Sequence, residues 1–266
     1  MTRRLALVTG ASAGIGAAFA RHLAARGHDL VLSARRVERL EALAGELRTG
    51  FGAEAFVAPA DLADPAGARR LLEQAATVGR PVEVLVNNAG YGLTGAFAQT
   101  RWSDQQAFLQ LMVVAPCELA HKLLPGMVER RYGRIVNVAS VAGLIPGAAG
   151  HTLYAGAKSL LVRFSQSLHL EAAPHGVHVS ALCPGFTWSE FHDVNGTRAQ
   201  ISAATPRWAW LPAERVVAEG WRAVEANQAV CVPGALYKLI CGAARLVPDG
   251  LALAVMRAQG PRFRKT

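Results

Sequence analysis

The amino-terminal stretch LALVTGASAGIG, residues 5–16, joins a short apolar run to three spaced glycines. The run Leu5–Thr9 shows little alternation of apolar and polar residues, which is typical of a strand buried on both faces. Gly10 permits a tight turn, Gly14 lets the backbone approach a pyrophosphate, and Gly16 lets the next helix pack closely on the strand. The amino end of that helix offers free N–H groups to phosphate oxygens. A strand before the glycines and a helix after them predict a dinucleotide-binding turn.

The same pattern of strand followed by helix continues along the chain. Seven apolar runs of strand length occur, at Leu5–Thr9, Asp29–Ser33, Glu54–Pro59, Val82–Val86, Arg134–Ala139, His178–Cys183 and Ala229–Val232. Helical stretches lie between them, at Gly14–Arg26, Val37–Arg48, Pro65–Ala76, Trp102–Arg131, Leu153–Ala173 and Pro212–Ala226. This alternation predicts an α/β fold in which helices cover both faces of a doubly wound parallel sheet. We expect a single Rossmann-type domain over residues 1–233, with a C-terminal helical extension over residues 234–266 packed on it.

Composition limits the classes of protein that this sequence fits. Apolar residues make up 52% of the 266 residues and charged residues 18%, which excludes a disordered polyampholyte, a collagen-like repeat and a coiled coil. The formal net charge is +9, but the basic residues are mostly scattered and no nucleic-acid-binding signature accompanies them. We therefore expect no nucleic-acid partner. Four cysteines without a Cys-x-x-Cys pair favour reduced thiols in a cytoplasmic protein.

Two segments imitate targeting signals. Met1–Ala20 has Arg3 and Arg4 before an uncharged stretch, and Ile135–Ala157 is uncharged and long enough to span a bilayer. Glycines and polar residues interrupt the first segment, and Pro146 with several polar residues interrupts the second. We interpret the chain as a soluble, unprocessed protein. The histidines show no metal-ligand spacing, so the sequence predicts no metal site.

The end of the second predicted strand, Leu32-Ser33-Ala34-Arg35-Arg36, bears on the choice of cofactor. An acidic residue here would bind the adenosine ribose hydroxyls and exclude a 2′-phosphate. Two arginines instead suit a phosphate dianion, so the sequence favours NADP(H) over NAD(H). Arg35 is the better candidate, whereas Arg36 could simply begin a solvated helix face. Asp61, beside Leu62 after the third strand, could bind the adenine amino group or cap the next helix.

A serine, a tyrosine and a lysine form the candidate catalytic group. Tyr154 and Lys158 lie four positions apart on one predicted helix, and therefore on one face of it. A free phenol has a pKa of about 10, but a neighbouring ammonium and a cationic nicotinamide ring both favour the phenolate and lower that pKa. Tyr154 could then exchange a proton with a substrate oxygen held by Ser140, while Lys158 also holds the nicotinamide ribose. The stretch Asn87-Asn88-Ala89-Gly90 after the fourth strand makes the combination distinctive.

Together these motifs resemble those of the short-chain dehydrogenase/reductase family, over nearly the whole chain. The resemblance rests on Thr9-Gly10-x-x-x-Gly14-Ile15-Gly16, Asp61, Asn87-Asn88-Ala89-Gly90, Ser140, Tyr154-x-x-x-Lys158 and Pro184-Gly185. It implies a Rossmann sheet of seven strands, a homodimer or homotetramer, and a segment after Pro184-Gly185 that closes over the nicotinamide. The motifs and the resemblance together predict these cofactor-binding residues: Gly10, Ser12, Ala13, Gly14, Ile15, Gly16, Arg35, Asp61, Leu62, Asn88, Ala89, Gly90, Tyr154, Lys158, Pro184, Gly185, Thr187 and Ser189.

The sequence departs from the family pattern in the helix after the fourth strand. The family usually has an asparagine there, whose main-chain carbonyl holds a water that relays protons to the lysine; the matching residue is Met112. Pro116, four residues on, has no N–H to pair with the Met112 carbonyl and should kink the helix. We expect the Met112 carbonyl to remain free for that water.

Three further features near the predicted site bear on its function: one spacing and one residue that differ from the family pattern, and one histidine. Ser140 and Tyr154 lie 14 positions apart, one more than the resemblance implies, which places an extra residue in the loop Pro146–Gly150. Ala13 stands where NADP(H)-preferring relatives often have a basic residue, so the phosphate preference rests mainly on the arginine at the strand end. His151 is interpreted as a rim residue that touches substrate and has no catalytic role.

The leading hypothesis is an NADP(H)-dependent oxidoreductase that interconverts a carbonyl and an alcohol by hydride transfer, with Tyr154 as general acid and base. A lid over residues 186–211 predicts a hydrophobic or bulky small-molecule substrate, because its side chains include Phe186, Trp188, Phe191, Trp208, Trp210 and Leu211. The alternative, suggested by Met112, is a catalytically weakened NADP(H)-binding protein with an interaction or regulatory role. The helical pieces Leu236–Leu246 and Leu251–Arg257 could also rest on anionic lipid, but we favour packing at a subunit interface or under the lid.

Overall fold

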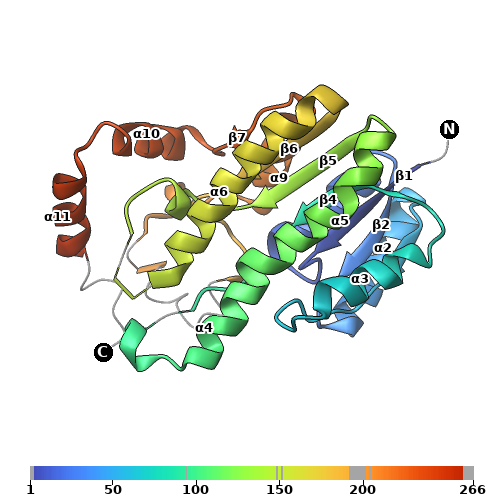
Figure 1. The fold of residues 1–266 in the computed structure, drawn as a ribbon, viewed down its shortest axis with the longest axis horizontal. Helices are drawn as coiled ribbons and strands as arrows, with labels where there is room; N and C mark the ends of the chain where they lie inside the picture. The colour runs from blue at the N-terminus through green and yellow to red at the C-terminus, as the bar shows by residue number, and fades with distance from the viewer. Residues whose placement is uncertain are drawn as a thin grey trace.

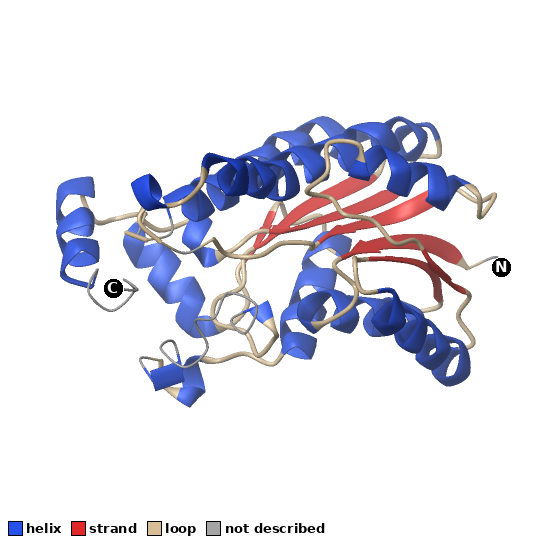
Figure 2. Cartoon of the chain, turned by 90° about the horizontal axis from the view of Figure 1, so that it is seen from below, coloured by secondary structure: helices blue, strands red, loops and turns tan. Residues whose placement is uncertain are grey.

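The computed structural model of the protein describes residues 3–93, 95–147, 149–150, 152–191, 202–203 and 205–259. Within these residues, seven parallel strands form one sheet in the order β3-β2-β1-β4-β5-β6-β7 (Figure 2). The strands are β1 (Arg4–Thr9), β2 (His28–Ser33), β3 (Ala55–Val57), β4 (Val82–Asn87), β5 (Gly133–Val138), β6 (Val177–Leu182) and β7 (Val230–Cys231). The predicted doubly wound α/β sheet is confirmed, and the strand ends differ from the predicted ones by one or two residues.

Helices cover both faces of this sheet, as Figures 1 and 2 show. One face carries α1 (Gly14–Ala25), α2 (Val37–Phe51) and α9 (Ala213–Glu225). The other face carries α3 (Gly67–Ala76), α5 (Ala115–Glu129) and α6 (Thr152–Ala172). The strands contribute to both hydrophobic clusters, because alternate side chains of one strand point to opposite faces. Each large apolar side chain fully buried between a helix and the sheet stabilises the fold by about 1.5–3 kcal/mol.

The strand order reverses between β1 and β4, which pair in parallel from Leu5 to Val8. Their carboxyl ends, Thr9 and Asn87, therefore lie next to each other at one edge of the sheet. In doubly wound sheets, ligands bind in the crevice at such a reversal, outside the carboxyl ends of the strands. The glycine turn after β1 and the asparagine stretch after β4 both fall at this point.

The helix predicted over Trp102–Arg131 is interrupted. Its segments are α4 (Trp102–Leu109), the π-helical segment η2 (Gln110–Val114) and α5 (Ala115–Glu129). The Ala115 N–H donates to the Gln110 carbonyl, five residues back, as in a π-helix. Pro116 follows at once and has no N–H, so the regular ladder of hydrogen bonds cannot pass through it. The expected irregularity is therefore present as a π-segment.

Among the described residues, the stretch Trp102–Glu129 is long and apolar enough to cross a membrane, and 33% of its most apolar window is buried inside the protein. Its α5 part packs on the sheet through buried residues such as Leu119. The other long apolar stretch, Ile135–Ala157, contains most of β5, a short turn of 3₁₀ helix and the beginning of α6. It therefore forms no single helix, as expected.

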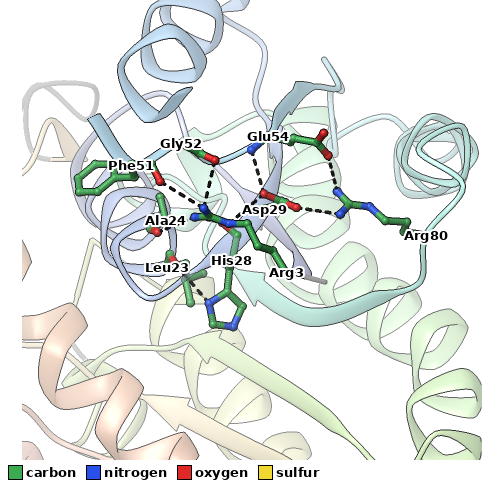
Figure 3. Close-up of polar contacts among 9 residues, drawn as sticks. All are labelled: Arg3, Leu23, Ala24, His28, Asp29, Phe51, Gly52, Glu54 and Arg80. Carbon is green, nitrogen blue, oxygen red and sulfur yellow. Dashed lines mark hydrogen bonds and ion pairs between the residues drawn. The ribbon is translucent and has the colours of Figure 1, made fainter. Parts of the chain in front are cut away.

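An ion-pair cluster lies at the amino end of the sheet (Figure 3). The side chain of Asp29, at the beginning of β2, is only 3% exposed. Its carboxylate oxygens lie 3.2 Å from Arg3 Nε and 2.8 Å from Arg80 Nη1, and one accepts the Glu54 N–H at 2.9 Å. Arg3 also donates to main-chain carbonyls around the cluster. A buried carboxylate is costly unless it is paired in this way, so these contacts hold the first strands together.

The two predicted C-terminal helical pieces are present as α10 (Ala235–Ala244) and α11 (Asp249–Gln259). They lie at the end of the molecule opposite β1 and β2 (Figure 1). Tyr237 of α10 is 5% exposed, whereas Leu239, Leu246 and Leu251 are exposed. One side of α10 is therefore held in the core next to the lid, while these three leucines of the extension point into solvent.

Candidate functional site

The turn after β1 leaves no room for side chains at its glycines. Gly10 and Gly14 have φ of +65° and +53°, a backbone region that favours glycine. A Cβ on Gly16 would lie 2.2 Å from the Gly10 carbonyl oxygen, and a Cβ on Gly10 would lie 2.7 Å from Asn88 Nδ2. These distances are far inside van der Waals contact. The close packing of the turn therefore requires glycine at these positions, and the N-terminus of α1 follows the turn directly.

Hydrogen bonds join the glycine turn to the end of β4. Thr9 Oγ1 accepts the N–H groups of Asn88 (2.9 Å) and Ala89 (3.1 Å), and it donates to the Val86 carbonyl at 3.2 Å. Asn88 Nδ2 donates to the carbonyls of Thr9 (3.0 Å) and Gly10 (3.2 Å). Two motifs almost eighty residues apart in sequence are thus one hydrogen-bonded unit.

Other predicted cofactor-binding residues surround this unit. Ala13 is the N-cap residue of α1, and Ile15 packs against the core on the α1 face of the sheet. A Cβ on Gly90 would lie 2.8 Å from Met112 Sδ. The side chain of Met112 therefore lies against Gly90, and a side chain at position 90 would collide with it.

The structure places Arg36, rather than Arg35, against the glycine turn. Arg36 Nε and Nη2 donate to Ser12 Oγ at 3.2 and 3.0 Å, and Nη1 donates to Glu190 Oε2 at 2.8 Å. Arg36 is the N-cap residue of α2 and its side chain is 41% exposed, as the helix-face interpretation expects, but it also contacts the glycine turn. Arg35 is exposed. The charge of Arg35 acts instead on Tyr91, which follows the asparagine stretch. Burial raises the pKa of the Tyr91 phenol, and the positive charge of Arg35 opposes that rise.

Asp61 forms a turn instead of capping α3. Its Oδ1 accepts the Ala63 N–H at 3.0 Å, two residues on. α3 begins at Gly67, two residues later than predicted, and the side chain of Asp64 bonds the main chain there. The helix-capping alternative for Asp61 is therefore wrong. The neighbouring Leu62 is buried.

Ser140, Tyr154 and Lys158 meet at the carboxyl end of β5. The Ser140 hydroxyl hydrogen-bonds the Tyr154 phenol, and its Oγ accepts the Ala142 N–H at 3.1 Å. Lys158 Nζ lies 5.8 Å from the centroid of the Tyr154 ring and donates to the Val138 carbonyl at 2.7 Å. Lys158 is 6% exposed, whereas Tyr154 is half-buried. The extra residue between Ser140 and Tyr154 leaves their contact intact.

Burial shifts the pKa values of this group toward the neutral forms. Desolvation raises the pKa of Tyr154 to about 12, although the hydrogen bond from Ser140 opposes the rise. Desolvation lowers the pKa of Lys158 to about 8. The expected lowering of the Tyr154 pKa, which counts on Lys158 and a cationic nicotinamide ring together, is therefore not present in the protein without ligand, because desolvation is the largest influence on the phenol there. To form the phenolate of Tyr154 near neutral pH, the site needs a positive charge in addition to Lys158.

Met112 and Lys158 line the same small cavity, of about 10 Å³, which is close to the volume that one water needs. Asn87 also lines it. Asn87 Nδ2 donates to the Pro116 carbonyl at 3.1 Å and to Asn137 Oδ1 at 2.9 Å. Its Oδ1 is buried and has no hydrogen-bond partner among the described residues. The cavity thus joins an acceptor that lacks a donor to the buried ammonium of Lys158.

Tyr237 of α10 hydrogen-bonds the lid that follows Pro184-Gly185. Its hydroxyl accepts the Phe186 N–H at 3.0 Å and donates to the Ala209 carbonyl at 2.6 Å, so it links both ends of the lid. A Cβ on Gly185 would lie 2.1 Å from the Tyr237 ring. Thr187 Oγ1 donates to the Gly185 carbonyl at 3.0 Å. The glycine therefore has a packing role beside its predicted role toward the cofactor.

The first residues of the lid lie across the site. Ser189 packs on the glycine turn, since a Cβ on Gly14 would lie 2.8 Å from Ser189 Cβ. The Phe191 ring centroid lies 5.9 Å from that of Tyr154. One short segment thus contacts both the predicted phosphate turn and the predicted catalytic ring.

Some predicted residues lie outside the part of the chain that the structure describes: His151, residue 148 in the loop Pro146–Gly150, and residues 192–201 and 204 of the lid. Two residues that the sequence analysis did not single out, Glu190 and Tyr237, contact predicted site residues. Glu190 lies within the predicted lid, next to Ser189, but no motif marks it, and Tyr237 reaches the lid from the C-terminal extension.

Comparisons with known proteins identify the family of the chain. The family model for short chain dehydrogenases matches residues 4–199. Nodulation protein G of Rhizobium sp. (strain N33) is 38% identical over 208 residues, which are 77% of this chain and 83% of that protein.

Solved structures give the same result. A short-chain dehydrogenase from Sphingobium yanoikuyae, in complex with NADPH, has a TM-score of 0.79 and 31% identity, over 92% of this chain and 97% of that one. The bulky-bulky ketone specific alcohol dehydrogenase from Comamonas testosteroni has a TM-score of 0.77 and 30% identity, over 94% of each chain. The chain belongs to the short-chain dehydrogenase/reductase family of oxidoreductases.

Proposed function

We propose that the protein is an NADP(H)-dependent oxidoreductase that interconverts a carbonyl and an alcohol on a small hydrophobic substrate. The observation that supports this most strongly is the meeting of Ser140, Tyr154 and Lys158 at the sheet edge that also carries the glycine turn. A hydroxyl, a phenol and a buried ammonium in one place can hold a carbonyl oxygen and move a proton to it.

The glycine turn after β1 fits a dinucleotide. We assign the pyrophosphate to this turn and to the N-terminus of α1, and the adenosine 2′-phosphate to Arg36 and Ser12. Asp61 remains our candidate for the adenine amino group, and Thr187 and Ser189 for the nicotinamide carboxamide. When bound, the cofactor supplies hydride to the substrate carbon or accepts it. The NADPH complex of the Sphingobium relative supports this choice of cofactor.

Tyr154 is the proton donor during reduction and the proton acceptor during oxidation. In reduction the neutral phenol is needed, and the raised pKa of Tyr154 keeps it neutral. In oxidation the phenolate is needed, and a cationic nicotinamide ring would add the positive charge that Lys158 alone does not supply. Ser140 holds the substrate oxygen beside the phenol, through the same hydroxyl that now bonds Tyr154.

The proton path is proposed to run from Lys158 through one water in the small cavity. The volume of this cavity and the unmatched Asn87 Oδ1 in its wall support a water there. The Met112 main-chain carbonyl remains our candidate for the second partner of that water. A long distance between this carbonyl and Lys158 Nζ in a structure of the complex would discard it.

A bulky apolar substrate is supported by the aromatic side chains of the lid. Trp188 stacks on Trp210 with ring centroids 4.5 Å apart, and Trp210 also contacts Phe186. Trp208, also in the lid, is 73% exposed and adds to the apolar surface of this segment. The Comamonas relative is named for bulky ketones. We further propose a homodimer or homotetramer in the cytoplasm; the four free cysteines support a reducing compartment.

The test is NADPH oxidation against a panel of ketones and aldehydes of increasing size, beside a calorimetric titration of NADPH. We expect NADPH to bind and to be oxidised with at least one bulky apolar ketone. Tight binding without turnover on any member of the panel would instead favour the alternative, a catalytically weakened NADP(H)-binding protein.

A further inference from the structure

The carboxylate of Glu190 lies between two arginines at the end of β2. Its Oε2 accepts from Arg36 Nη1 at 2.8 Å, and its Oε1 accepts from Arg39 Nη1 at 2.5 Å. The other edge of the Arg36 guanidinium is bound to Ser12 Oγ. One carboxylate from the lid thus occupies donors of two arginines that stand beside the glycine turn.

The neighbours of Glu190 fix its position. Ser189 packs on Gly14 of the turn, and Phe191 contacts the Tyr154 ring. Three consecutive lid residues therefore contact the phosphate turn, the arginine pair and the catalytic phenol. If Glu190 moves away from the arginines, residues 189–191 can carry that movement to the ring of Tyr154.

Glu190 is an anion at neutral pH. Hydrogen bonds from Arg36 and then from Arg39 lower its pKa below the ordinary value for a glutamate. A phosphate monoester carries about −1.5 to −2 charge at pH 7 and accepts the same kind of charge-assisted hydrogen bonds. A phosphate bound to the Arg36 and Arg39 guanidinium groups would compete with Glu190 for their donors, and the two anions would repel each other there.

We propose that Glu190 competes with the cofactor's 2′-phosphate for Arg36 and Arg39, and so sets how strongly the protein prefers NADP(H) to NAD(H). The inference rests on the cofactor site of the proposed function. Binding of a 2′-phosphate requires the carboxylate to leave the arginines. A cofactor with a free 2′-hydroxyl leaves the pairs intact. Glu190 therefore reduces the difference between the affinities of the protein for NADP(H) and for NAD(H).

The expected effect is moderate, because the side chains of Glu190, Arg36 and Arg39 are 41%, 41% and 49% exposed. Solvent and salt screen ion pairs at such positions. Removing the carboxylate frees both arginines without changing the glycine turn.

The test uses two fragments without a nicotinamide, adenosine 2′,5′-bisphosphate and adenosine 5′-monophosphate, titrated calorimetrically into the full chain. Glu190→Gln should bind the bisphosphate about three- to tenfold more tightly than the original protein, because two half-exposed ion pairs no longer oppose it. Binding of the monophosphate should not change. Glu41→Gln, an equal change of charge at an exposed position of α2, is the matched control and should stay within about twofold. The gain of Glu190→Gln should shrink when salt is raised from about 0.05 to about 0.5 M.

An unchanged or weaker bisphosphate affinity in Glu190→Gln would overturn the proposal, as would an equal gain in Glu41→Gln or a gain that salt does not reduce. These titrations need no turnover. A protein that binds the fragments as expected but reduces no carbonyl would contradict the proposed reaction and leave the role of Glu190 standing.

Discussion

Strand β2 has an arginine–carboxylate cluster at each end. At its amino end, Asp29 pairs with Arg3 and Arg80 and is 3% exposed; beyond its carboxyl end, Glu190 pairs with two arginines and is 41% exposed. The chemistry is the same, but the surroundings differ. The buried cluster has no free alternative to its pairs, so it holds strands together. The exposed one can exchange partners with water or with a ligand, so it can take part in binding.

The same contrast extends across the sheet. Around Asp29, each carboxylate oxygen has an arginine or a main-chain N–H as its partner. At the carboxyl end, Tyr154 and Lys158 have pKa values shifted by burial, and Asn87 Oδ1 is unmatched among the described residues. Polar groups held in such unfavourable surroundings cost stability and cluster at functional sites. The Asp29 cluster therefore stabilises the fold, whereas keeping Tyr154 and Lys158 buried at the carboxyl end costs part of that stability.

The largest effect is expected from Tyr154→Phe. The variant keeps the ring and its contact with Phe191 but removes the proton donor, so kcat/KM for carbonyl reduction should fall about 10²–10⁴-fold. The unfolding free energy should hardly change. Tyr132→Phe is the control at the amino end, where the ring packs under Arg4 and Arg134. Comparable kcat/KM values for both variants would contradict the assignment.

Asp29→Asn should act on stability alone. The amide can still accept the Glu54 N–H but leaves Arg3 without its counter-charge and Arg80 with Glu54 alone, so the unfolding free energy in urea should fall by about 2–3 kcal/mol. Activity per folded molecule should be preserved. Glu83→Gln, which removes the looser 3.5 Å pair with Arg4, is the control and should cost less than about 1 kcal/mol. A loss of activity in folded Asp29→Asn would contradict the claim that the cluster at the amino end acts on stability alone.

Lys158→Met should lower turnover and yet stabilise the fold. The pKa of Lys158 is lowered from 10.5 to about 8, so at pH 7 the folded protein carries an ammonium that it disfavours, at a cost of about 3 kcal/mol. The variant also loses the hydrogen bond to the Val138 carbonyl, worth about 1 kcal/mol, which leaves a net gain of about 2 kcal/mol.

The pH dependence of this gain checks its cause. Between pH 8 and 10.5 the unfolded lysine binds more proton than the folded one, so the stability of the original protein rises with pH over this range. The advantage of Lys158→Met should be full below pH 8 and shrink toward pH 10.5. Urea denaturation across this range measures it. A constant difference would show that burial of the charge is not the cause.

The smallest effect is expected from Tyr237→Phe. Loss of the hydrogen bonds to Phe186 and Ala209 should lower the unfolding free energy by about 1–2 kcal/mol. Because both bonds hold the ends of the lid, KM for a bulky ketone should rise more than kcat falls. Limited proteolysis would show faster cleavage within the lid. Unchanged KM with reduced stability would mean that Tyr237 packs the core without positioning the lid.

Most of the fold could be predicted from the sequence, because the strands are uniformly apolar and the glycines after β1 are spaced as a close backbone requires. Pro116 predicted an irregular helix, but the sequence does not distinguish the π-helical form that the structure has from a simple kink. Arg35 and Arg36 are equally suitable by composition; the conformation of the chain after β2 decides which of them reaches Ser12. The pKa of Tyr154 depends on desolvation by distant segments, which adjacent sequence does not reveal.

The most direct test of the proposed reaction uses NADPH labelled with deuterium at the transferable position, together with a bulky apolar ketone. The account predicts that the product alcohol carries one deuterium on its carbinol carbon with the original protein, and that Tyr154→Phe forms almost none although it binds NADPH normally. Alcohol formed without deuterium, or formed equally by Tyr154→Phe, would contradict it.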